Sequence, residues 1–578
     1  MRKLFKRKTQ NNNGVALNAP WTKYYNDVPS KLNYFQGTIA EMIEMSANKY
    51  ASLDAYEYYG VTCTYQEFYK KIEAAAAALK AQGVTENDRV TICMPNTPQG
   101  LIVFYAVNMV GAIANMIHPL SAENEIEFYL NVSNSKFLFT IDIAYEKIMH
   151  IIDNTKVEKI VVVSAAQDFG RSMTFLYWLT QGRKINVKIE RDNIIGWKKF
   201  IESGKKYIGN YKCHKSADSI AVILYSGGTT GTPKGIMLSN KNFNAMAEQA
   251  SAMCHTSPKE SVLSIMPIFH GFGLTVCIHT PLSSGMKCIL IPDFSSKKFV
   301  GLIRKFHPNF VVGVPTLFDS LTKSVFGANE LSCITQVISG GDSLDPSLKE
   351  RVDQFLRDHG SLTEVREGYG LTESSGATCL TPINSYRRGS IGIPFPDTYF
   401  KIVINGTHDE APIGNDGEIC ISGPTVMAGY LDNIDETLQT LRTHDDGHVW
   451  LHTGDIGSMD ADGFVYFKQR LKRVIISSGY NIYPTYVESI INAHPAVLTS
   501  TVIGVSHPHK VQVAKAYVVL KENYKPTESL KRDILEHCSK NLAKYSMPSY
   551  LEFRESLPRT LVGKVAYKEL EKENEKHN

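Results

Sequence analysis

Residues 225–240 read YSGGTTGTPKGIMLSN, a stretch rich in glycine, serine and threonine that contains a single lysine, Lys234. Glycines let backbone N–H groups approach an anion closely, and the hydroxyls and the lysine supply further donors and positive charge, so the stretch is suited to phosphate. It does not fit the Walker A pattern, because Pro233 precedes the lysine and Gly235 follows it. The flanking runs SIAVILY and GIMLS are both predicted strands, so we expect a phosphate loop that joins two strands rather than a strand and a helix.

Strands and helices alternate on both sides of this loop. Upstream, QEFYKKIEAAAAALKAQG is a predicted helix that ends at Gly83, and RVTICMPN, KFLFTI and KIVVVSA are predicted strands. Downstream, KCILIPD, FVVGVP and ITQVISGG are short apolar runs that each lead into a turn. This order predicts parallel βαβ units with helices on the sheet faces, and therefore an α/β fold.

Residues 101–120 form an apolar run without Asp, Glu, Lys or Arg that is long enough to imitate a membrane span. Asn108, Asn115 and His118 lie within the run, and Gly111 falls near its middle. We therefore favour a helix through Val110, a turn at the glycine and a short strand, AIANMI. A membrane span is the alternative.

The composition is ordinary for a soluble globular protein. The 578 residues are too many for one hydrophobic core and predict two to four domains. Lys and Arg number 62 against 58 Asp and Glu, a balance that argues against a nucleic-acid partner. The ten cysteines form no CxxC pair, which predicts reduced thiols in a cytoplasmic protein. The basic start, MRKLFKRKTQNNNG, lacks the apolar segment of a secretory signal, and we favour a solvated tail over an anchor on a membrane surface.

Changes in composition and strand pattern along the chain predict its domains. Residues 385–468 contain short strands separated by Gly, Asn and Asp, which predicts a small β-rich subdomain. The predicted domains are a tail and lead-in (1–34), a large N-terminal domain with two parallel-sheet subdomains and the β-rich subdomain (35–470), and a small mobile α+β C-terminal domain (471–578). Residues 168–210 interrupt the α/β order with an aromatic and basic insertion. We favour an insertion packed on its own domain, and contact with a membrane or with an apolar substrate is the alternative.

Four further motifs follow the loop. In EGYGLTESSG, Tyr369 is suited to stack on a base, Thr372 to donate to a phosphate and Glu373 to bind Mg²⁺. In LHTGDIG, Asp455 is suited to accept from two ribose hydroxyls. The others are RLKRVIISSGYNIYPTYVE and LPRTLVGKVAYKEL, which contains Lys564. Taken singly, the first motif is explained equally well by a turn and the second by a solvated loop acid, whereas Lys564 by itself is better explained as a surface lysine.

In this order the motifs resemble those of the adenylate-forming superfamily, which includes acyl-CoA synthetases, nonribosomal adenylation domains and luciferases. The resemblance covers residues from about 35 to 570, and YSGGTTGTPKG is its most specific part. It implies two steps. A carboxylate first reacts with ATP to give an acyl-adenylate and pyrophosphate, and a thiol then takes the acyl group and releases AMP. Because a negative carboxylate must approach a negative triphosphate, cations and fixed donors must offset the repulsion.

The resemblance also implies roles for individual residues. The β- and γ-phosphates of ATP would be held by Ser226, Gly227, Gly228, Thr229, Thr230, Gly231 and Lys234. Adenine would lie against Gly340, Gly341, Asp342, Tyr369 and Gly370, and ribose against Asp455 and Arg470. Catalysis would fall to Thr372 at the α-phosphate, Glu373 at Mg²⁺, and Lys564, which would bridge the carboxylate and the α-phosphate.

The resemblance further implies that the C-terminal domain swings between the two steps. Lys472 stands at the family's hinge position, and Gly479 and Tyr480 would line the path of CoA after the swing. Two features depart from the family. An arginine, Arg473, follows the hinge position where an acid is usual, and a Gly-Glu pair is missing before AKAYVVL. The first puts the charge pairing at the hinge in doubt, and the second makes CoA contacts at that strand less certain.

Two residues bear on which carboxylic acid is the substrate. His270, in MPIFHGFGL, matches the pocket-entrance histidine of the family, although a core histidine at a strand end is the alternative. Gly370 replaces the tryptophan of acetate-activating relatives, and we expect it to leave the pocket floor open for a longer acyl group. The predicted function is thus a medium- or long-chain fatty acid:CoA ligase with ATP, CoA and Mg²⁺, cytoplasmic or peripheral at a membrane. The alternatives are an enzyme that loads a separate acyl carrier protein and a nucleotide-binding protein with a decayed site.

Overall fold

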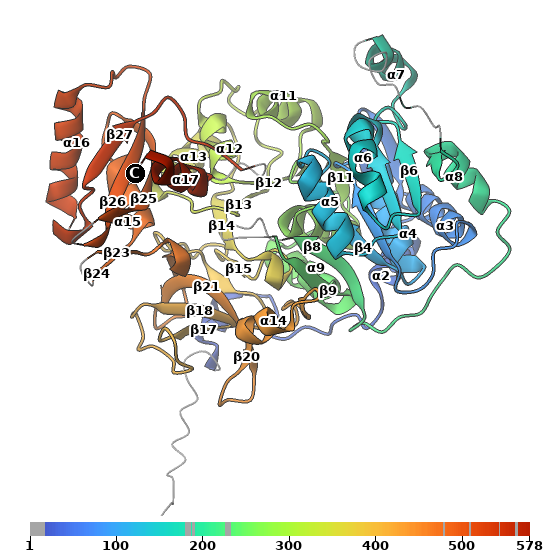
Figure 1. Ribbon diagram of the computed structural model, residues 1–578, viewed down its shortest axis with the longest axis horizontal. Coiled ribbons are helices and arrows are strands. Elements are labelled where there is room, and N and C mark those ends of the chain that lie inside the picture. The colour runs from blue at the N-terminus through green and yellow to red at the C-terminus, as the bar shows by residue number, and fades with distance from the viewer. Residues whose placement is uncertain are drawn as a thin grey trace, which may run out of the picture.

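The computed structural model describes residues 18–179, 187, 191–225, 233–477, 480–507, 510–542, 544–560 and 565–577 (Figure 1). The predicted phosphate loop joins two strands of an eight-stranded sheet. In spatial order the strands are β19 (Gly429–Tyr430), β9 (Gly235–Ser239), β8 (Ile220–Tyr225), β4 (Ile113–Met116), β3 (Arg89–Cys93), β5 (Phe137–Ile141), β6 (Lys159–Val163) and β7 (Ile194–Gly196). The strands from β8 to β7 run parallel, whereas β9 is antiparallel to β8. The predicted parallel α/β arrangement is confirmed.

A second, nine-stranded sheet leads into residues 340–342 and carries the start of the EGYGLTESSG motif. Its order is β16 (Ile393–Pro394), β15 (Cys379–Leu380), β14 (Val365–Tyr369), β13 (Gln336–Ser339), β12 (Phe310–Gly313), β10 (Ser261–Ser264), β11 (Lys287–Leu290), β1 (Asp54–Tyr58) and β2 (Val61–Thr64). The strands from β14 to β1 are parallel. Ligands of open parallel sheets bind beyond the carboxyl ends of the strands, so β13 and β14 point their loops toward a site.

Helices cover both sheets (Figure 1). Those of the first half are α2 (Ile39–Lys49), α3 (Tyr65–Ala81), α4 (Pro98–Met109), α5 (Glu123–Val132), α6 (Tyr145–Ile151), α7 (Arg171–Tyr177) and α8 (Trp197–Gly204). Those that follow β9 along the chain in this domain are α9 (Asn240–Cys254), α10 (Thr280–Ser283), α11 (Ser296–Phe306), α12 (Pro315–Thr322), α13 (Pro346–Asp358) and α14 (Ile434–Thr440). The insertion is in part the short helix α7, which projects from the body (Figure 1).

The apolar run 101–120 forms the expected helix, turn and strand. Thr97 caps α4, and every residue of this helix is buried. Gly111 has a φ of 77°, the left-handed conformation that glycine accepts readily, and β4 follows it. The described residues contain no helix long and apolar enough to cross a membrane.

The predicted β-rich subdomain is a five-stranded antiparallel sheet. Its strands are β17 (Tyr399–Val403), β18 (Gly417–Ser422), β20 (Leu441–Thr443), β21 (Val449–Met459) and β22 (Val465–Arg470). The chain then passes through a 3₁₀ turn, Leu471–Arg473, into the last domain.

The C-terminal domain has its own sheet and core. The sheet contains β23 (Ile475–Ser477), β24 (Tyr480–Ile482), β25 (Val497–His507), β26 (Val511–Leu520) and β27 (Tyr550–Phe553), with helices α15 (Pro484–Asn492), α16 (Glu528–Asn541) and α17 (Tyr567–His577). Its buried apolar side chains form two clusters that are separate from the large cluster of the N-terminal domain. A small domain with its own core is therefore confirmed, and its boundary at residue 471 remains a prediction.

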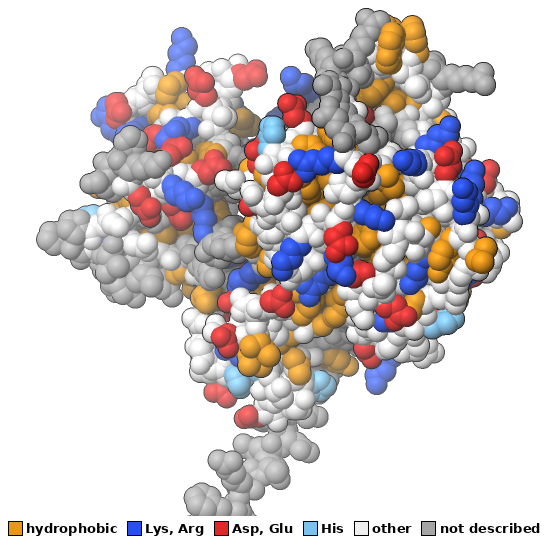
Figure 2. Space-filling view, turned by 45° about the vertical axis from the view of Figure 1, so that its right-hand side comes forward, with side chains coloured by type: hydrophobic (Ala, Val, Ile, Leu, Met, Phe, Trp, Pro, Cys, Tyr) orange, Lys and Arg blue, Asp and Glu red, His pale blue; other side chains and the backbone are white. Residues whose placement is uncertain are grey.

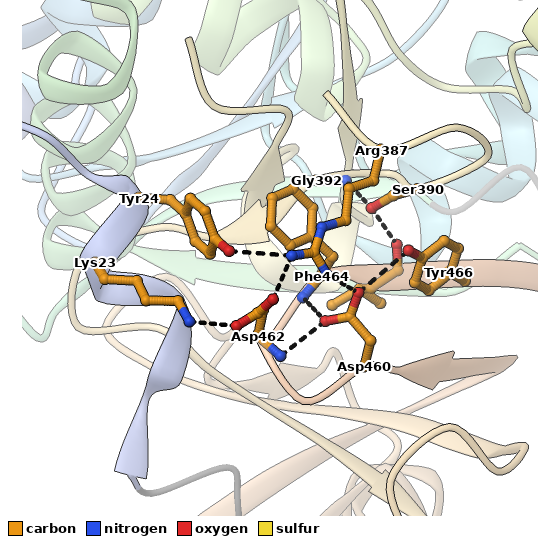
Figure 3. Close-up of polar contacts among 10 residues, drawn as sticks. Lys23, Tyr24, Arg387, Ser390, Gly392, Asp460, Asp462, Phe464 and Tyr466 are labelled. Carbon is orange, nitrogen blue, oxygen red and sulfur yellow. Dashed lines mark hydrogen bonds and ion pairs between the residues drawn. The ribbon is translucent and has the colours of Figure 1, made fainter. Parts of the chain in front are cut away.

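The lead-in before residue 35 packs closely against the β-rich subdomain. Trp21 is fully buried, and Arg387 donates to the hydroxyl of Tyr24 at 3.0 Å (Figure 3). The same guanidinium pairs with Asp460 and Asp462 in the turn between β21 and β22. These contacts attach residues 18–34 to the large domain.

Candidate active site

The predicted phosphate loop joins β8 to β9, two strands as expected. Tyr225 and Gly235 are cross-strand partners, so the ends of the loop lie opposite one another. Of the residues predicted to hold phosphate, Ser226, Gly227, Gly228, Thr229, Thr230 and Gly231 lie outside the described residues. Lys234 is described, and its Nζ pairs with Glu436 and lies 5.1 Å from the centre of the Tyr430 ring.

One of the two neighbours of Lys234, Tyr430, also reaches the predicted magnesium ligand. Asn433 caps α14, which places Glu436 in the first turn of that helix. The hydroxyl of Tyr430, in β19, donates to Glu373 Oε1 at 3.1 Å. Sequence reasoning missed Tyr430 and Glu436, because neither carries a motif and only the pairing of β19 with β9 brings them to the loop.

Glu373 lies in a 3₁₀ turn, Thr372–Ser374, that directly follows β14 and Gly370. Its carboxylate lines the cavity described below, as does Thr372. Mg²⁺ prefers oxygen ligands and is commonly bound by one or two carboxylates together with substrate phosphates. A cavity-lining glutamate near the predicted phosphate loop fits that pattern.

Asp455, Arg470 and Tyr369 form one polar cluster. Asp455 and Arg470 are cross-strand partners in β21 and β22, and Arg470 Nε lies 3.2 Å from Asp455 Oδ1. The hydroxyl of Tyr369, at the end of β14, donates to Asp455 Oδ2 at 2.7 Å. Asp455 is only 2% exposed, and its charge raises the pKa of Arg470. The structure thus brings together three residues that are far apart in the sequence and that the sequence predicted to bind the nucleoside.

Two further buried side chains, Glu418 and His452, support the turn that holds Asp455. Glu418 accepts from the backbone N–H of Gly454 at 2.9 Å, and its other oxygen lies 2.8 Å from His452 Nδ1. Together with Cys420 these side chains form a buried group of the kind that binds metal. Because Glu418 already bonds to the ring and to the turn, the group acts here as a brace for Asp455.

Gly340, Gly341 and Asp342 follow β13 at its carboxyl end. A Cβ at Gly340 would lie 3.2 Å from Cζ of Phe272 and 3.3 Å from the carbonyl oxygen of Gly368, so the backbone passes very close to its neighbours. Gly341 has a φ of 81°. All three residues line the cavity, where the sequence predicted an adenine site.

Glu367 is a cavity residue that sequence reasoning missed. It is buried in β14, accepts from the backbone N–H of Leu344 at 3.1 Å, and lies close enough to Asp342 to feel its charge. Burial raises the pKa of its carboxyl to about 8. The signal was present in the sequence, since Glu367 begins the EGYGLTE motif and an acid within a buried strand is rare.

The expectation for Gly370 is wrong in its physical reason. Gly370 lines the cavity, but a Cβ there would lie 2.5 Å from the Ala377 Cα and from the carbonyl oxygen of Gly376. The direction of a side chain is therefore filled by backbone and does not open a pocket floor. Glycine is required at this position because the chain folds back on itself after β14.

His270 lines the same cavity, and its Nδ1 accepts from the backbone N–H of Phe272 at 3.2 Å. It precedes a π-helix, Phe272–His279, that packs against α9. By contrast, His279 is fully buried, its Nε2 lies 3.0 Å from Asn244 Oδ1, and burial lowers its pKa to about 3. Of these two histidines, His270 is the one that faces the cavity.

One cavity of about 3490 Å³ joins these groups. It runs past Asp342, Tyr369 and Asp455 to the C-terminal domain, and Figure 2 shows a notch between that domain and the larger body. In the other direction its wall is apolar and reaches the insertion. The residues of that end are Tyr58, Tyr59, Ile143, Phe169, Met173, Leu176 and Tyr177.

The remaining predicted residues belong to the C-terminal domain. Lys564 and Gly479 lie outside the described residues. Val565 and Tyr567, just after the lysine, line the cavity. Lys472 lies in the turn between the two domains, and Tyr480 begins β24.

Comparison with known proteins agrees with this geometry. A family model described as AMP-binding enzyme matches residues 43–431, and one described as AMP-binding enzyme C-terminal domain matches residues 486–564. A long-chain-fatty-acid–CoA ligase of Bacillus subtilis is 34% identical over 97% of this chain and 99% of its own length. A protein of the same name from Escherichia coli is 29% identical over 95% of this chain and 97% of its own.

Solved structures show the same fold. The anthranilate CoA ligase AuaEII with anthranoyl-AMP superposes with a TM-score of 0.82 at 23% identity, covering 96% of this chain and 99% of the other. ATP-bound MatB from Rhodopseudomonas palustris superposes with a TM-score of 0.80 at 24% identity, covering 93% of this chain and 100% of the other. Motifs, fold and family models agree, and this chain belongs to the family of AMP-binding enzymes.

Proposed function

We propose that this protein is an ATP-dependent, AMP-forming carboxylic acid:CoA ligase, and that its acid is a medium- or long-chain fatty acid. Relatives that match it over nearly their whole length are named long-chain-fatty-acid–CoA ligases. The observation that carries the proposal is the cavity, in which nucleotide-type groups at one end are continuous with an apolar wall toward the insertion. An apolar wall of this kind suits a hydrocarbon chain.

The first step joins the acid to AMP. A carboxylate oxygen attacks the α-phosphorus, and the bond to the β-phosphate breaks so that pyrophosphate leaves. Asp455 and Arg470 would fix the ribose, and Gly340, Gly341 and Tyr369 would hold the adenine against β13 and β14. Lys234 and the loop 226–231 would hold the leaving phosphates. Lys564 and Thr372 would offset the charge that gathers around the α-phosphate.

Mg²⁺ is the proposed metal, held by Glu373 and phosphate oxygens, and it would supply positive charge that screens the triphosphate. Tyr430 would orient the Glu373 carboxylate, because its hydroxyl donates to Oε1. Lys234 would exchange its pairing with Glu436 for phosphate when ATP binds. This exchange keeps the loop lysine paired while the site is empty.

The second step transfers the acyl group. The CoA thiolate attacks the acyl carbon, and the bond to the AMP oxygen breaks, so AMP leaves with that oxygen. We propose that the C-terminal domain turns at Lys472 between the steps, withdrawing Lys564 and bringing Gly479 and Tyr480 to the thiol path. One cavity can then serve both reactions.

The test is pyrophosphate release and thioester formation with saturated acids of six to eighteen carbons, each with and without CoA. We expect AMP and acyl-CoA to form in equal amounts, with kcat/KM highest at ten carbons or more. Product formed only on a phosphopantetheinylated carrier protein would reassign the acceptor. No acyl-CoA with any acid of the panel would overturn the proposed function.

We further propose a cytoplasmic protein that touches the membrane through α7. Phe175, Leu176, Trp178 and Leu179 are between 41% and 61% exposed, a dense apolar patch for a short segment (Figure 2). Leu176 also lines the cavity. An apolar acid dissolved in a bilayer would therefore meet the patch and the cavity mouth together.

Vesicle binding tests this contact. We expect the double variant Phe175→Ser, Trp178→Ser to lose most of its sedimentation with anionic vesicles and to show a raised KM for vesicle-borne oleate. The matched control is Tyr524→Ser, Tyr550→Ser, which removes two exposed aromatics from the C-terminal domain. Equal binding by the two double variants would contradict a role for α7.

A further inference from the structure

The two domains are joined by a very short segment. The large apolar cluster of the N-terminal domain and the two clusters of the C-terminal domain share no residue, and between them runs the turn Leu471–Arg473. What fixes each end of this segment decides which bonds can rotate when the domains move.

Arg470 fixes the N-terminal end. It closes β22, and its Nε lies 3.2 Å from Asp455 Oδ1 on the neighbouring strand. Cross-strand pairing of the same two residues ties their backbones together as well. The chain therefore belongs to the N-terminal domain up to Arg470.

Arg473 fixes the C-terminal end. Its Nη2 donates to Glu488 Oε1 at 2.6 Å, in α15, and to the carbonyl oxygen of Val502 at 3.2 Å, in β25. The guanidinium carbon lies 4.6 Å from the centre of the Tyr567 ring, at the start of α17. One side chain thus contacts three elements of the C-terminal domain.

The pairing of Arg473 with Glu488 takes the place of the charge pairing at the hinge that the sequence put in doubt. Burial alone would lower the pKa of Arg473, but the carboxylate of Glu488 outweighs it, and the pKa is raised. An arginine suits this place better than a lysine, because its planar group can donate in two directions and stack on a ring at once. The arginine after the hinge position is therefore paired within its own domain.

We propose that Arg473 is a positioning residue that confines rotation between the domains to Leu471 and Lys472 and, through its contact with Tyr567, holds the start of α17, three residues after Lys564. This rests on the proposed function, in which Lys564 acts in the first step. Tyr567 follows Lys564 by three residues and lines the cavity. Loss of the guanidinium would leave the start of α17 without this contact to the hinge.

The variant Arg473→Ala should still fold. Glu488 Oε1 also accepts from Thr501 Oγ1 at 3.0 Å and from the backbone N–H of Val502 at 2.7 Å, so its carboxylate stays hydrogen-bonded. The chain also offers a matched control in Arg554. It pairs with Glu552 and Glu573 and lies 5.1 Å from the Tyr517 ring, yet it does not line the cavity.

Half-reaction kinetics give the first readout. Since a misplacement of about 1 Å can cost about 10²-fold, we expect Arg473→Ala to lower kcat for adenylation about 10- to 100-fold, with KM for ATP changed less than about threefold. Arg473→Lys should recover only part of the loss. Arg554→Ala should leave kcat near the wild-type value. A kcat for Arg473→Ala equal to that of Arg554→Ala would overturn the proposal, as would a loss seen only in KM.

Hydrogen exchange gives a readout that needs no activity. In the full-length protein without substrates, we expect exchange over residues 471–476 and 565–572 to rise about fivefold or more in Arg473→Ala, and not in Arg554→Ala. Unchanged exchange in these segments would overturn the proposal. If the wild-type protein had no adenylation activity but the variants still showed this exchange pattern, the proposed function would be wrong. The positioning role of Arg473 would still hold.

Discussion

At the residue scale, Asp455 is the side chain on which most of the proposed nucleoside site depends. Its Oδ2 accepts from Tyr369, its Oδ1 lies 3.2 Å from Nε of Arg470 on a different sheet, and Glu418 supports the turn beneath it. A buried carboxylate with these neighbours is held in one orientation, so in our proposal it would offer fixed acceptors to a ribose. Its value to binding lies in that fixed position as much as in its charge.

Replacing the charge without changing the shape tests this role. Hydrogen bonds to charged groups contribute about 1.5–3 kcal/mol, so Asp455→Asn should lower kcat/KM for ATP about 10- to 100-fold. Steady-state kinetics with ATP varied would measure the loss. KM for the acid serves as the internal control and should stay within about twofold. A normal kcat/KM for ATP would remove Asp455 from the ribose site.

Glu367 makes a prediction about pH. Its folded pKa is about 8 against an ordinary value of 4.5, so the native state keeps a proton that the unfolded chain loses. Its contribution to stability is complete below pH 4.5 and falls as pH rises toward 8. The difference between these two pKa values corresponds to at most about 5 kcal/mol in the free energy of unfolding.

Glu367→Gln removes this titration and keeps an acceptor for Leu344. We therefore expect the variant to melt higher than the wild type at pH 8.5, with a difference that shrinks at pH 5. Thermal unfolding at several pH values measures it. Parallel pH profiles for the two proteins would show that Glu367 is not protonated in the native state.

At the element scale, the strand β14 and the turn after it hold the site together. The chain leaves β14 at Tyr369, passes Gly370 against the backbone of residues 376–377, and presents Thr372 and Glu373 to the cavity. The close approach of two backbone segments fixes where the turn points. In our proposal, space for the acyl chain comes instead from the apolar end of the cavity near the insertion.

Adding one methyl group tests this close approach. Gly370→Ala places a carbon 2.5 Å from backbone atoms, and overpacking of this kind costs about 1–3 kcal/mol. We expect a lower melting temperature and a loss of adenylation, because Thr372 and Glu373 must shift. The control is Gly301→Ala in α11, where a Cβ meets nothing within 4 Å and alanine should stabilise the helix. Full activity in Gly370→Ala would show that the turn can adapt.

At the scale of the whole molecule, the site lies between two domains with separate cores. The N-terminal domain carries the described groups predicted to bind the nucleotide, and the C-terminal domain closes the same cavity with Arg473 and Tyr567. Because the domains have separate cores and are joined at the turn Leu471–Arg473, their relative position is a property that substrates can change. The two half-reactions should therefore respond differently to changes in the smaller domain.

Lys564→Ala separates the two half-reactions. The account predicts a loss of adenylation of about 10²-fold or more, since this lysine is proposed to offset charge at the α-phosphate. Thioester formation from supplied acyl-adenylate and CoA should stay within about threefold of the wild type. Rapid-quench assays of each half-reaction measure both. An equal loss in the two would contradict the proposed change of position.

Much of this molecule was predictable from local sequence, and the failures have physical causes. Gly111 marked the turn after α4, and the flanks of Lys234 predicted two strands, because turns and strands depend on neighbouring residues. The burial of Trp21 and the pairing of Tyr430 with Glu373 come from chain segments that meet only in three dimensions. The error at Gly370 was of the same kind, since the obstructing atoms belong to a return of the chain.

The central claim is that the acid passes through a mixed anhydride with AMP. The most direct test is to supply decanoate labelled with oxygen-18 in its carboxylate, together with ATP, Mg²⁺ and CoA, and to analyse the nucleotide product by mass spectrometry. The account predicts AMP that carries one oxygen-18 atom, because the bond from the acyl carbon to the bridging oxygen breaks in the second step. Unlabelled AMP, or ADP as the nucleotide product, would contradict it.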